Sequence, residues 1–253
     1  MIPTDTPTSP SSSSAATNPL LPSQKRNSPS NESLPVAQAC CGRKTVYSLR
    51  DMIALIDYGS GNLRSVEKAL ARVGGDVRIT SAADDVMAAD AVVLPGVGAF
   101  GDCVNNLAQL GLVNPLRDFI ASRRPFLGIC VGLQMLFEDG AESPGVAGLG
   151  VLPGTVPRFP DSALKVPHMG WNQLRIKKPD CPLLRGVADG SYVYFVHSYY
   201  GRPREDAVVA ATTEYGVEFA AVLWRENLFA TQFHPEKSQA VGLQMLANFV
   251  GLR

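Results

Sequence analysis

The chain has 253 residues, a formal net charge of zero and a hydrophobic fraction of 45%. This balance offers no basic stripe for a nucleic acid and no polybasic patch for a membrane surface, so neither partner is expected. No apolar run approaches the roughly 20 residues that a membrane helix needs. The hydrophobic fraction is enough for a sizeable core, and we expect one domain of about 200 residues.

Residues 1–51 are rich in Ser, Pro and Thr and poor in apolar side chains. Such a segment cannot bury enough surface to offset its ordering entropy, so we expect a disordered tail before a domain over residues 52–253. The tail lacks the apolar centre of a secretory signal. Its serines and few acids leave an organelle transit peptide open, although its prolines and scarce arginines argue against one. A start of translation at Met52 is a second alternative.

The domain opens with strand and helix patterns in alternation. Two helices are predicted from apolar spacing, over 62–73 and, with an interruption near Gly111, over 107–122. Alternation of this kind predicts an α/β fold, a doubly wound and mostly parallel sheet with helices on both faces. Ligands of such folds bind at the carboxyl ends of the strands. The predicted strands are Ile53–Ile56, Val77–Thr80, Ala91–Leu94 and Pro125–Ile129.

After Gly140 the pattern changes to short strands bounded by Gly, Pro, Asp and Asn. We expect an antiparallel or mixed strand region in this C-terminal half, closed by a helix over Gln239–Leu252. The predicted strands are Gly150–Phe159, Gly170–Ile176, Ser191–Tyr199, Val208–Thr213, Ala220–Arg225 and Leu228–Phe233.

Cys130 lies where a strand pattern turns abruptly into a helical one. Gly128 and Gly132 flank it, and small neighbours allow the close backbone approach of a tight strand-to-helix turn. A thiol at a helix N-terminus favours the reactive thiolate. We therefore predict that Cys130 is a nucleophile, and the alternative is a buried structural cysteine.

The cysteines as a set indicate a reducing compartment. Their number is odd and their spacing is not that of zinc ligands, so we expect no metal site, and we expect a cytoplasmic location. The five are Cys40, Cys41, Cys103, Cys130 and Cys181.

A nucleophilic cysteine needs a base, and the histidines are His168, His197 and His234. His234 precedes Pro235, which biases it toward an extended conformation. Residues two apart in extended chain point to the same side, so Glu236 is expected beside His234, where its carboxylate orients the imidazole. The cysteine, His234 and Glu236 form a candidate catalytic triad. An ordinary exposed turn is the alternative.

A glycine-rich loop, 95–101, follows the apolar strand that ends at Leu94. Glycine permits backbone conformations that direct N–H groups inward. We predict two oxyanion donors, the N–H of Val97 in this loop and the N–H of Val131 after the nucleophile. Phosphate binding is the alternative, but no Gly-Lys-Ser/Thr sequence follows the loop.

These motifs resemble those of a known family. Segments 95–100, 128–134 and 232–236 resemble, in this order, the class I or triad-type glutamine amidotransferases. Segments 56–66, 166–172 and 194–200 resemble more narrowly the glutaminase subunits of imidazole glycerol phosphate synthases. The resemblance covers the chain from about Met52 to Arg253. Val131 and Leu133 stand where Leu and Met are common, and no triad position is missing.

The resemblance implies that the chain hydrolyses L-glutamine to glutamate and ammonia through a thioester on Cys130, without a cofactor. It also implies a heterodimer with a separate cyclase subunit. That partner would use the ammonia to make imidazole glycerol phosphate and an aminoimidazole carboxamide ribonucleotide in histidine biosynthesis. The glutamine contacts that it implies are Gly96, Gly98, Gln134, His197, Ser198 and Tyr199.

Residues in loops at the active-site end of the sheet are expected to face the partner, because ammonia must leave there. Lys237, next to the triad acid, would pair with a partner carboxylate, and Trp171 would be an aromatic anchor. In the alternatives, Lys237 is solvated, Trp171 is core, Gln134 is a solvated helix residue and the strand around His197 is aromatic core. The expected interface residues are Asn62, Arg64, Trp171, Asn172 and Lys237.

Three other functions stay open. The first is the amidotransferase subunit of another synthase, such as that for anthranilate or aminodeoxychorismate, and the Trp171 segment argues against it. The second is a cysteine peptidase or unrelated hydrolase, which the glutamine-type motifs disfavour. The third is a regulatory binding module, which would not need Cys130, His234 and Glu236 together.

Overall fold

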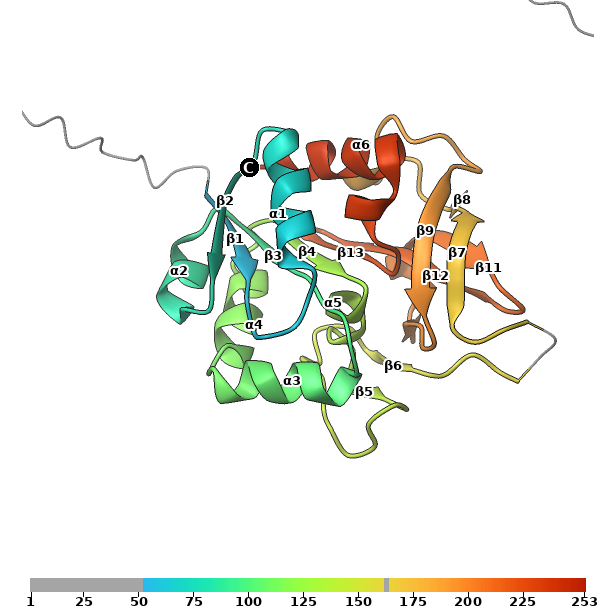
Figure 1. Ribbon diagram of the computed structural model, residues 1–253, viewed down its shortest axis with the longest axis horizontal. Helices are drawn as coiled ribbons and strands as arrows, with labels where there is room; N and C mark the ends of the chain where they lie inside the picture. Colours follow the sequence, from blue (N-terminus) through green and yellow to red (C-terminus); the bar gives the residue numbers. More distant parts are fainter. Residues whose placement is uncertain (1–51, 162–163) are drawn as a thin grey trace, which may run out of the picture. The chain divides into compact units, whose positions relative to one another are not determined.

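The computed structural model describes residues 52–161 and 164–253, and the predicted tail over residues 1–51 lies outside them. The described residues form an eight-stranded sheet, a three-stranded sheet and a two-stranded ribbon, with helices around the large sheet (Figure 1). Among the helices of these two ranges, none has the length and apolar character needed to span a bilayer.

The first five strands of the large sheet run parallel to one another. Four of them are buried along their whole length, as expected for strands covered on both faces. The edge strand instead alternates exposed and partly buried positions. In spatial order the five are β2 (Asp76–Thr80), β1 (Met52–Ile56), β3 (Ala91–Leu94), β4 (Phe126–Ile129) and β13 (Leu228–Thr231).

The remaining strands of the large sheet are antiparallel, and this mixed region lies in the C-terminal half as predicted. After β13 they are β12 (Glu218–Arg225), β11 (Val209–Glu214) and β8 (Arg175–Ile176). A separate antiparallel ribbon pairs β7 (His168–Gln173) with β9 (Tyr192–His197). The three-stranded sheet consists of β5 (Asp139–Gly140), β6 (Gly154–Val156) and β10 (Arg202–Pro203). The predicted fold class is confirmed.

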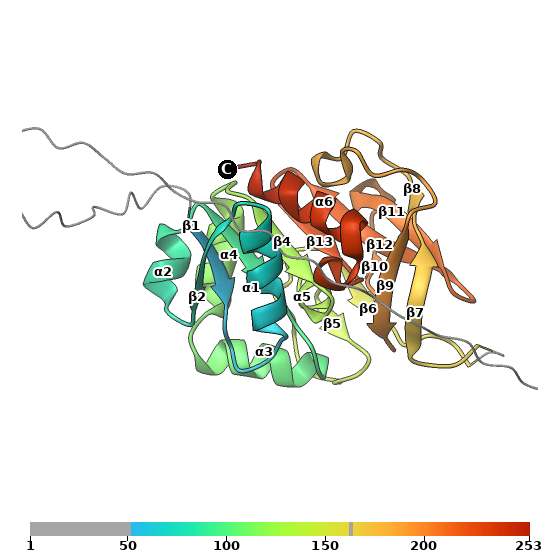
Figure 2. The same ribbon diagram turned by 45° about the horizontal axis from the view of Figure 1, so that its top comes forward.

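Helices cover both faces of the parallel half. Helix α1 (Leu63–Arg72) packs beside α6 (Gln239–Val250), and α2 (Ala83–Ala88) packs beside α4 (Val113–Ala121). The two pairs lie on opposite faces (Figures 1 and 2). Helix α1 lies in the crossover from β1 to β2 and α2 in the return from β2 to β3, and right-handed crossovers that run in opposite directions along a sheet put their helices on opposite sides. Helix α3 (Phe100–Gln109) follows the loop after β3, and α5 (Val131–Gln134) follows β4.

Several boundaries differ from the sequence prediction. The helical pattern expected over 107–122 is interrupted at Gly111 as predicted, where φ is +67°, and it belongs to two helices, α3 and α4. The first begins at Phe100, where the backbone N–H donates to the Glu142 carboxylate at 2.7 Å. Helix α2 was missed because its six residues are too few to show a helical period. Helix α5 ends at Gln134, although the apolar pattern continues to Phe137.

Several strands of the C-terminal half are shorter than predicted, whereas β12 is longer and begins at Glu218. The segment 150–159 contains only β6, and 170–176 divides into β7 and β8 at the buried Leu174. Strands β5 and β10, of two residues each, were not predicted.

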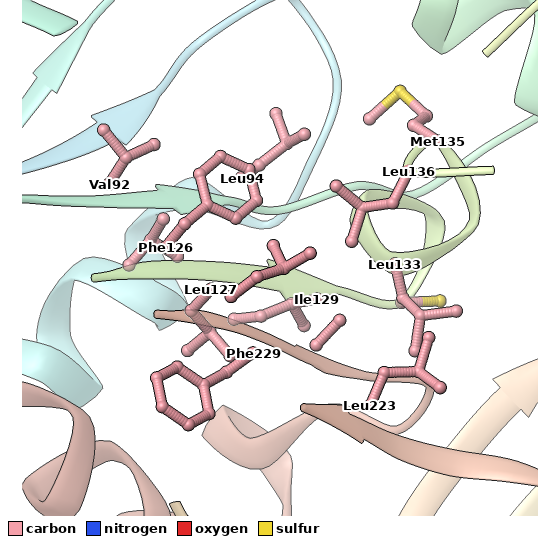
Figure 3. Close-up of a cluster of buried hydrophobic side chains, with 14 of the residues drawn as sticks. Val92, Leu94, Phe126, Leu127, Ile129, Leu133, Met135, Leu136, Leu223 and Phe229 are labelled. Atoms are coloured by element: carbon pink, nitrogen blue, oxygen red, sulfur yellow. The ribbon is translucent and has the colours of Figure 1, made fainter. Parts of the chain in front are cut away.

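The core reaches the turn after β4, which we call the elbow (residues 128–134). Figure 3 shows the side chains of Leu94, Ile129, Leu133 and Leu136 in one buried cluster with those of the neighbouring strands. Leu133 and Leu136 are fully buried. The residues that follow the cysteine are therefore anchored by the same packing that holds the parallel strands.

Backbone contacts inside the elbow explain its glycines. Cys130 has a φ of +56°, which is uncommon for a residue with a side chain. A Cβ on Gly132 would lie 1.9 Å from the Leu94 carbonyl oxygen, and one on Gly128 would lie 2.8 Å from the Gly132 carbonyl oxygen. Both glycines are required by close backbone approach, as the sequence indicated.

Gly132→Ala should destabilise the protein strongly, because its new Cβ meets rigid backbone. Overpacking costs roughly 1–3 kcal/mol, so we expect a loss of about 3 kcal/mol, which corresponds to a melting temperature lower by roughly 6–12 °C. Gly251→Ala is the matched control, since no atom lies closer than 3.5 Å to its Cβ position. A Gly132→Ala protein that melts like the wild type would contradict the described elbow.

Candidate active site

A cavity of about 400 Å³ lies at the carboxyl ends of the central strands, the edge at which the sequence predicted the site. Glu142, Pro167 and Val196 are lining residues that the sequence did not indicate. The predicted site residues that line the cavity are Val97, Gly98, Cys130, Val131, Gln134, His197, Ser198, Tyr199, His234 and Lys237.

Two of the predicted catalytic and glutamine-contact residues are absent from this lining. Glu236 has a side chain that is 1% exposed and hydrogen bonded to His234. Gly96 packs against the start of α5, where a Cβ would lie 2.8 Å from Cβ of Val131. Gly96 therefore allows close packing of the loop on the elbow.

His234 and Glu236 form a buried pair. The His234 Nδ1 and Glu236 Oε1 atoms are 2.7 Å apart, and the two side chains are 3% and 1% exposed. The pairing was predicted, and His234 is extended as expected, with a φ of −98° and a ψ of 100°, but the chain does not stay extended as far as Glu236. Residues Pro235–Lys237 form a 3-10 helix, η3, so a tight turn and not an extended chain brings the carboxylate back to the imidazole.

The charge on His234 depends on its two neighbours. Burial opposes a charge on its ring, but interactions with Cys130 and Glu236 outweigh burial and raise the pKa of His234 to about 10. The Cys130 sulfur is near enough to stabilise the positive charge on His234, but it does not form a hydrogen bond with Nε2. Nε2 therefore has no hydrogen-bond partner among the described residues. The site therefore favours an imidazolium next to the Cys130 sulfur, with one N–H left to donate to a group that enters the cavity.

Gln232 is a site residue that the sequence analysis missed. Its side chain is fully buried, and its Nε2 donates to the Cys130 sulfur at 3.9 Å. Its Oε1 accepts a hydrogen bond from Gln134 at 3.3 Å. The available signal was its place two residues before His234 at the end of a strand, where both side chains point to the same side.

Gln134 and the segment around Tyr199 meet on the cavity wall. Gln134 is 3% exposed, so it is not a solvated helix residue. Its Nε2 donates to the Tyr199 carbonyl oxygen at 2.9 Å, and His197 Nδ1 lies 2.8 Å from the same oxygen. His197 also packs against Phe159, Phe195 and Phe219. It is thus both a cavity residue and part of an aromatic core.

The two residues predicted to supply oxyanion donors both line the cavity. Val131 is the first residue of α5, so its N–H has no acceptor within the helix. The Val97 carbonyl oxygen accepts hydrogen bonds from the Ser60 hydroxyl and, at 3.6 Å, from the Cys103 thiol. Ser60 and Cys103 were not predicted as site residues, and their contacts hold the glycine loop from behind.

The side chains of three predicted interface residues differ in exposure and in their partners. Trp171 is 46% exposed, so it is not core. Arg64 is exposed and pairs with Glu67 at 2.9 Å. Asn172 turns inward and donates to the Glu214 carbonyl oxygen at 2.9 Å.

Across residues 52–161 and 164–253, no cluster of His, Cys, Asp or Glu is arranged to hold a metal ion.

Comparison of the sequence with known proteins gives one consistent family. The profile of the family "Glutamine amidotransferase class-I" matches residues 54–251. The chain is 55% identical over 203 residues to the "Imidazole glycerol phosphate synthase subunit HisH" of Geobacter metallireducens, covering 78% of this chain and 96% of that protein. The protein of the same name from Methanocaldococcus jannaschii is 49% identical over 201 residues and is covered completely, with 79% of this chain.

Solved structures share the fold at low sequence identity. One described as a crystal structure of glutamine amidotransferase matches with a TM-score of 0.62 and 19% identity, covering 78% of this chain and 98% of that one. The glutaminase domain of Trypanosoma brucei CTPS with bound acivicin matches with a TM-score of 0.56 and 15% identity, over 80% of this chain and 94% of that one. These likenesses establish the fold.

The coupling between the buried His234–Glu236 pair and the reactivity of Cys130 can be tested by chemical modification. At pH 7 we expect iodoacetamide to alkylate Cys130 faster than Cys103 or Cys181, because burial raises the pKa of the latter two thiols. Glu236→Gln should slow alkylation of Cys130 by about tenfold, since it removes the charge that stabilises the imidazolium. Mass spectrometry of the separate cysteine peptides measures each rate. An unchanged rate at Cys130 in this variant would contradict the proposed coupling.

Proposed function

This chain belongs to the class-I glutamine amidotransferases, and on that premise we propose that it hydrolyses L-glutamine as the amidotransferase subunit of imidazole glycerol phosphate synthase in histidine biosynthesis. The observation that carries the proposal is the meeting of Cys130 and His234 at one cavity of about 400 Å³, with Glu236 bonded to His234 behind it. It is supported by relatives named as this subunit, which the chain matches over nearly their whole length.

In the first step, the Cys130 thiolate attacks the side-chain carbonyl carbon of glutamine. The carbonyl oxygen becomes an oxyanion, which the N–H groups of the glycine loop and of Val131 would stabilise. His234 then transfers its Nε2 proton to the departing ammonia, and a glutamyl thioester remains on the sulfur. Glu236 holds the imidazole by the opposite nitrogen, so Nε2 faces the reacting atoms.

In the second step, water attacks the thioester. His234, now neutral, accepts a proton from the water, and the second oxyanion collapses with release of glutamate and the thiolate. Each proton moves through the same Nε2 atom, which is buried and without a partner in the described part of the chain. Gln134, His197, Ser198 and Tyr199 line the space where the rest of the glutamine would lie.

The ammonia must reach a second active site. Ammonia released into water is protonated and loses its nucleophilicity, so a covered route to the consuming enzyme is an advantage. The relatives are named as subunits, which implies a partner subunit. We propose that the partner is the cyclase that uses ammonia to form imidazole glycerol phosphate and the aminoimidazole ribonucleotide.

The β7–β9 ribbon provides a surface for this partner. Met169 and Trp171 on β7 and Tyr192 on β9 are exposed by 63%, 46% and 53%, and Trp171 packs edge-on against Tyr194. Large exposed apolar side chains that gather on one face are typical of protein–protein contacts. We propose that the cyclase covers this face and the mouth of the cavity beside Lys237.

We also propose that Asn62 and Arg64 contact the cyclase. They lie where the loop after β1 meets the start of α1. Residues 52–253 would be the amidotransferase domain, and residues 1–51 would take no part in catalysis. We propose a cytoplasmic site of action, in keeping with the free thiols of Cys103, Cys130 and Cys181.

Cys130→Ala should abolish synthesis from glutamine while the complex still makes product from added ammonium salts. The reason is that only glutamine hydrolysis uses the thiol, whereas the cyclase consumes ammonia from either source. Product formation by the reconstituted complex, measured with each nitrogen donor, tests this. Loss of the ammonium-dependent reaction as well would argue against a division of labour between two subunits.

Trp171→Ala and Lys237→Ala should each weaken cyclase binding about tenfold or more, or remove its stimulation of glutaminase activity, with little change in melting temperature. Met87→Ala is the matched control, since Met87 is 42% exposed but lies on α2, away from the ribbon. Unchanged binding and stimulation combined with a sharply lower melting temperature would show that these side chains stabilise the subunit instead.

A further inference from the structure

A continuous line of polar contacts runs from β7 to the cavity. The Asn172 amide lies 3.3 Å from Nε2 of His168, and Nδ1 of His168 lies 3.3 Å from Nε2 of His197. Nδ1 of His197 lies 2.8 Å from the Tyr199 carbonyl oxygen, which also accepts from Gln134. Asn172 and His168 are outside the cavity lining, so they reach the pocket through other residues.

The orientation of the Asn172 amide is fixed by backbone groups. Its Nδ2 donates to the Glu214 carbonyl oxygen at 2.9 Å, and its Oδ1 accepts from the Gln173 N–H at 2.8 Å. In a flipped amide, the side-chain oxygen would face the Glu214 carbonyl oxygen, and the side-chain N–H would face the Gln173 N–H. Nδ2 must therefore donate to His168, whose Nε2 carries no proton.

The Tyr199 end of this line of contacts requires the same direction of hydrogen-bond donation. The Tyr199 carbonyl can only accept, so Nδ1 of His197 carries a proton and, in the neutral ring, Nε2 does not. His168 must then donate from Nδ1. Both ends therefore require neutral imidazoles with the proton on Nδ1, and protonation of either ring would break a link.

The surroundings of the two rings favour the neutral state. Burial lowers the pKa of His168 to about 4 and the pKa of His197 to about 3. Phe195 and Tyr215 stack on His168 with centroid distances of 4.7 and 4.0 Å. The ionisable groups that line the cavity together with His197 are Cys130, Glu142, Tyr199, His234 and Lys237, and the effect of His234 on His197 also opposes a positive charge.

We propose that Asn172 and His168 are positioning residues for the glutamine pocket, and that their directed hydrogen bonds hold His197 in the tautomer that donates to the Tyr199 carbonyl. That carbonyl receives His197 and Gln134 together, so it fixes the Gln134 amide on the cavity wall. The substrate named here rests on the proposed function.

The same line continues to the nucleophile. With one N–H of Gln134 donated to Tyr199, the other donates to Oε1 of Gln232 at 3.3 Å. The amide of Gln232 is thereby oriented with Nε2 toward the Cys130 sulfur at 3.9 Å. A change of tautomer at His197 would release the first of these amides and loosen the second.

Nitrogen NMR of the full-length chain tests the tautomers directly, because a protonated ring nitrogen and a bare one differ in chemical shift. The chain has three histidines, and the signals of His168 are those that His168→Asn removes. We expect both His168 and His197 to be neutral and protonated on Nδ1 throughout the range of about pH 5.5 to 8. A proton on Nε2 of either ring in the wild type would overturn the proposal.

Kinetics of the complex with the cyclase test the effect on the pocket. His168→Phe keeps a ring between Phe195 and Tyr215 but removes the donor, and it should raise KM for glutamine about tenfold, with kcat within about twofold. His168→Asn retains an N–H near the Nδ1 position and should keep KM within about threefold of the wild type. Synthesis from ammonium salts should be unchanged in both variants.

Asn172→Asp reverses the first link, since a carboxylate can only accept a hydrogen bond. Nε2 of His168 should then carry a proton, and KM for glutamine should rise as in His168→Phe. Tyr215→Phe is the matched control, because its hydroxyl donates to the Lys165 carbonyl and not to the histidines. It should leave both the tautomers and KM unchanged.

The outcomes separate this inference from the proposed function. A wild-type complex that does not hydrolyse glutamine would refute the proposed function, and the NMR spectra would still decide whether the line of hydrogen bonds exists. In an active complex, a wild-type KM for His168→Phe would overturn the positioning role. Equal impairment of His168→Asn and His168→Phe would do the same, because it would show that ring packing matters and the donor does not.

Discussion

The contact between Gly132 and the Leu94 carbonyl sets the geometry on which the site depends. At 1.9 Å from the position of an added Cβ, this oxygen leaves no room for a side chain. The start of α5 can therefore press against the end of β3, and Cys130 takes a φ of +56° at the turn between them. A non-glycine residue in such a conformation costs about 1–3 kcal/mol, which the burial of Leu133 and Leu136 beneath the elbow offsets. The result is a thiol presented to a cavity, with the N–H of Val131 beside it.

The polar groups around this thiol are almost fully hydrogen bonded, and the exceptions are informative. In the described ranges, the buried side-chain atoms without a partner are Thr213 Oγ1, His234 Nε2 and Glu236 Oε2. Two of these belong to the triad. A buried polar atom left unpaired is costly, so its presence at the cavity indicates a group kept available for a reactant. By contrast, the amides of Gln134 and Gln232 have their N–H groups engaged, which makes them parts of a rigid frame.

The parallel half of the sheet and the triad could be predicted from sequence because their signals are local. Continuous apolar runs mark β1, β3 and β4, and two glycines around one cysteine mark the elbow. Gln232, His168 and Ser60 could not be assigned, because their roles come from contacts across large sequence separations, such as Gln134 with Gln232. The turn at Pro235–Lys237 brought together the predicted pair by a different backbone route. Helix α2 was too short for a periodicity to define it, whereas α5 was indicated by the pattern after Cys130 but ends earlier than that pattern.

The central claim is that one thiol in one cavity reacts with the carboxamide of glutamine. It is tested most directly with a glutamine analogue that carries a chloroketone in place of the carboxamide, added to the full-length chain in complex with the cyclase. Peptide mass spectrometry should find the label on Cys130, free glutamine should protect against it, and synthesis from glutamine should be lost in proportion to labelling while synthesis from ammonium salts persists. Labelling of Cys103 or Cys181 instead, or labelling of Cys130 that glutamine does not slow, would contradict the account.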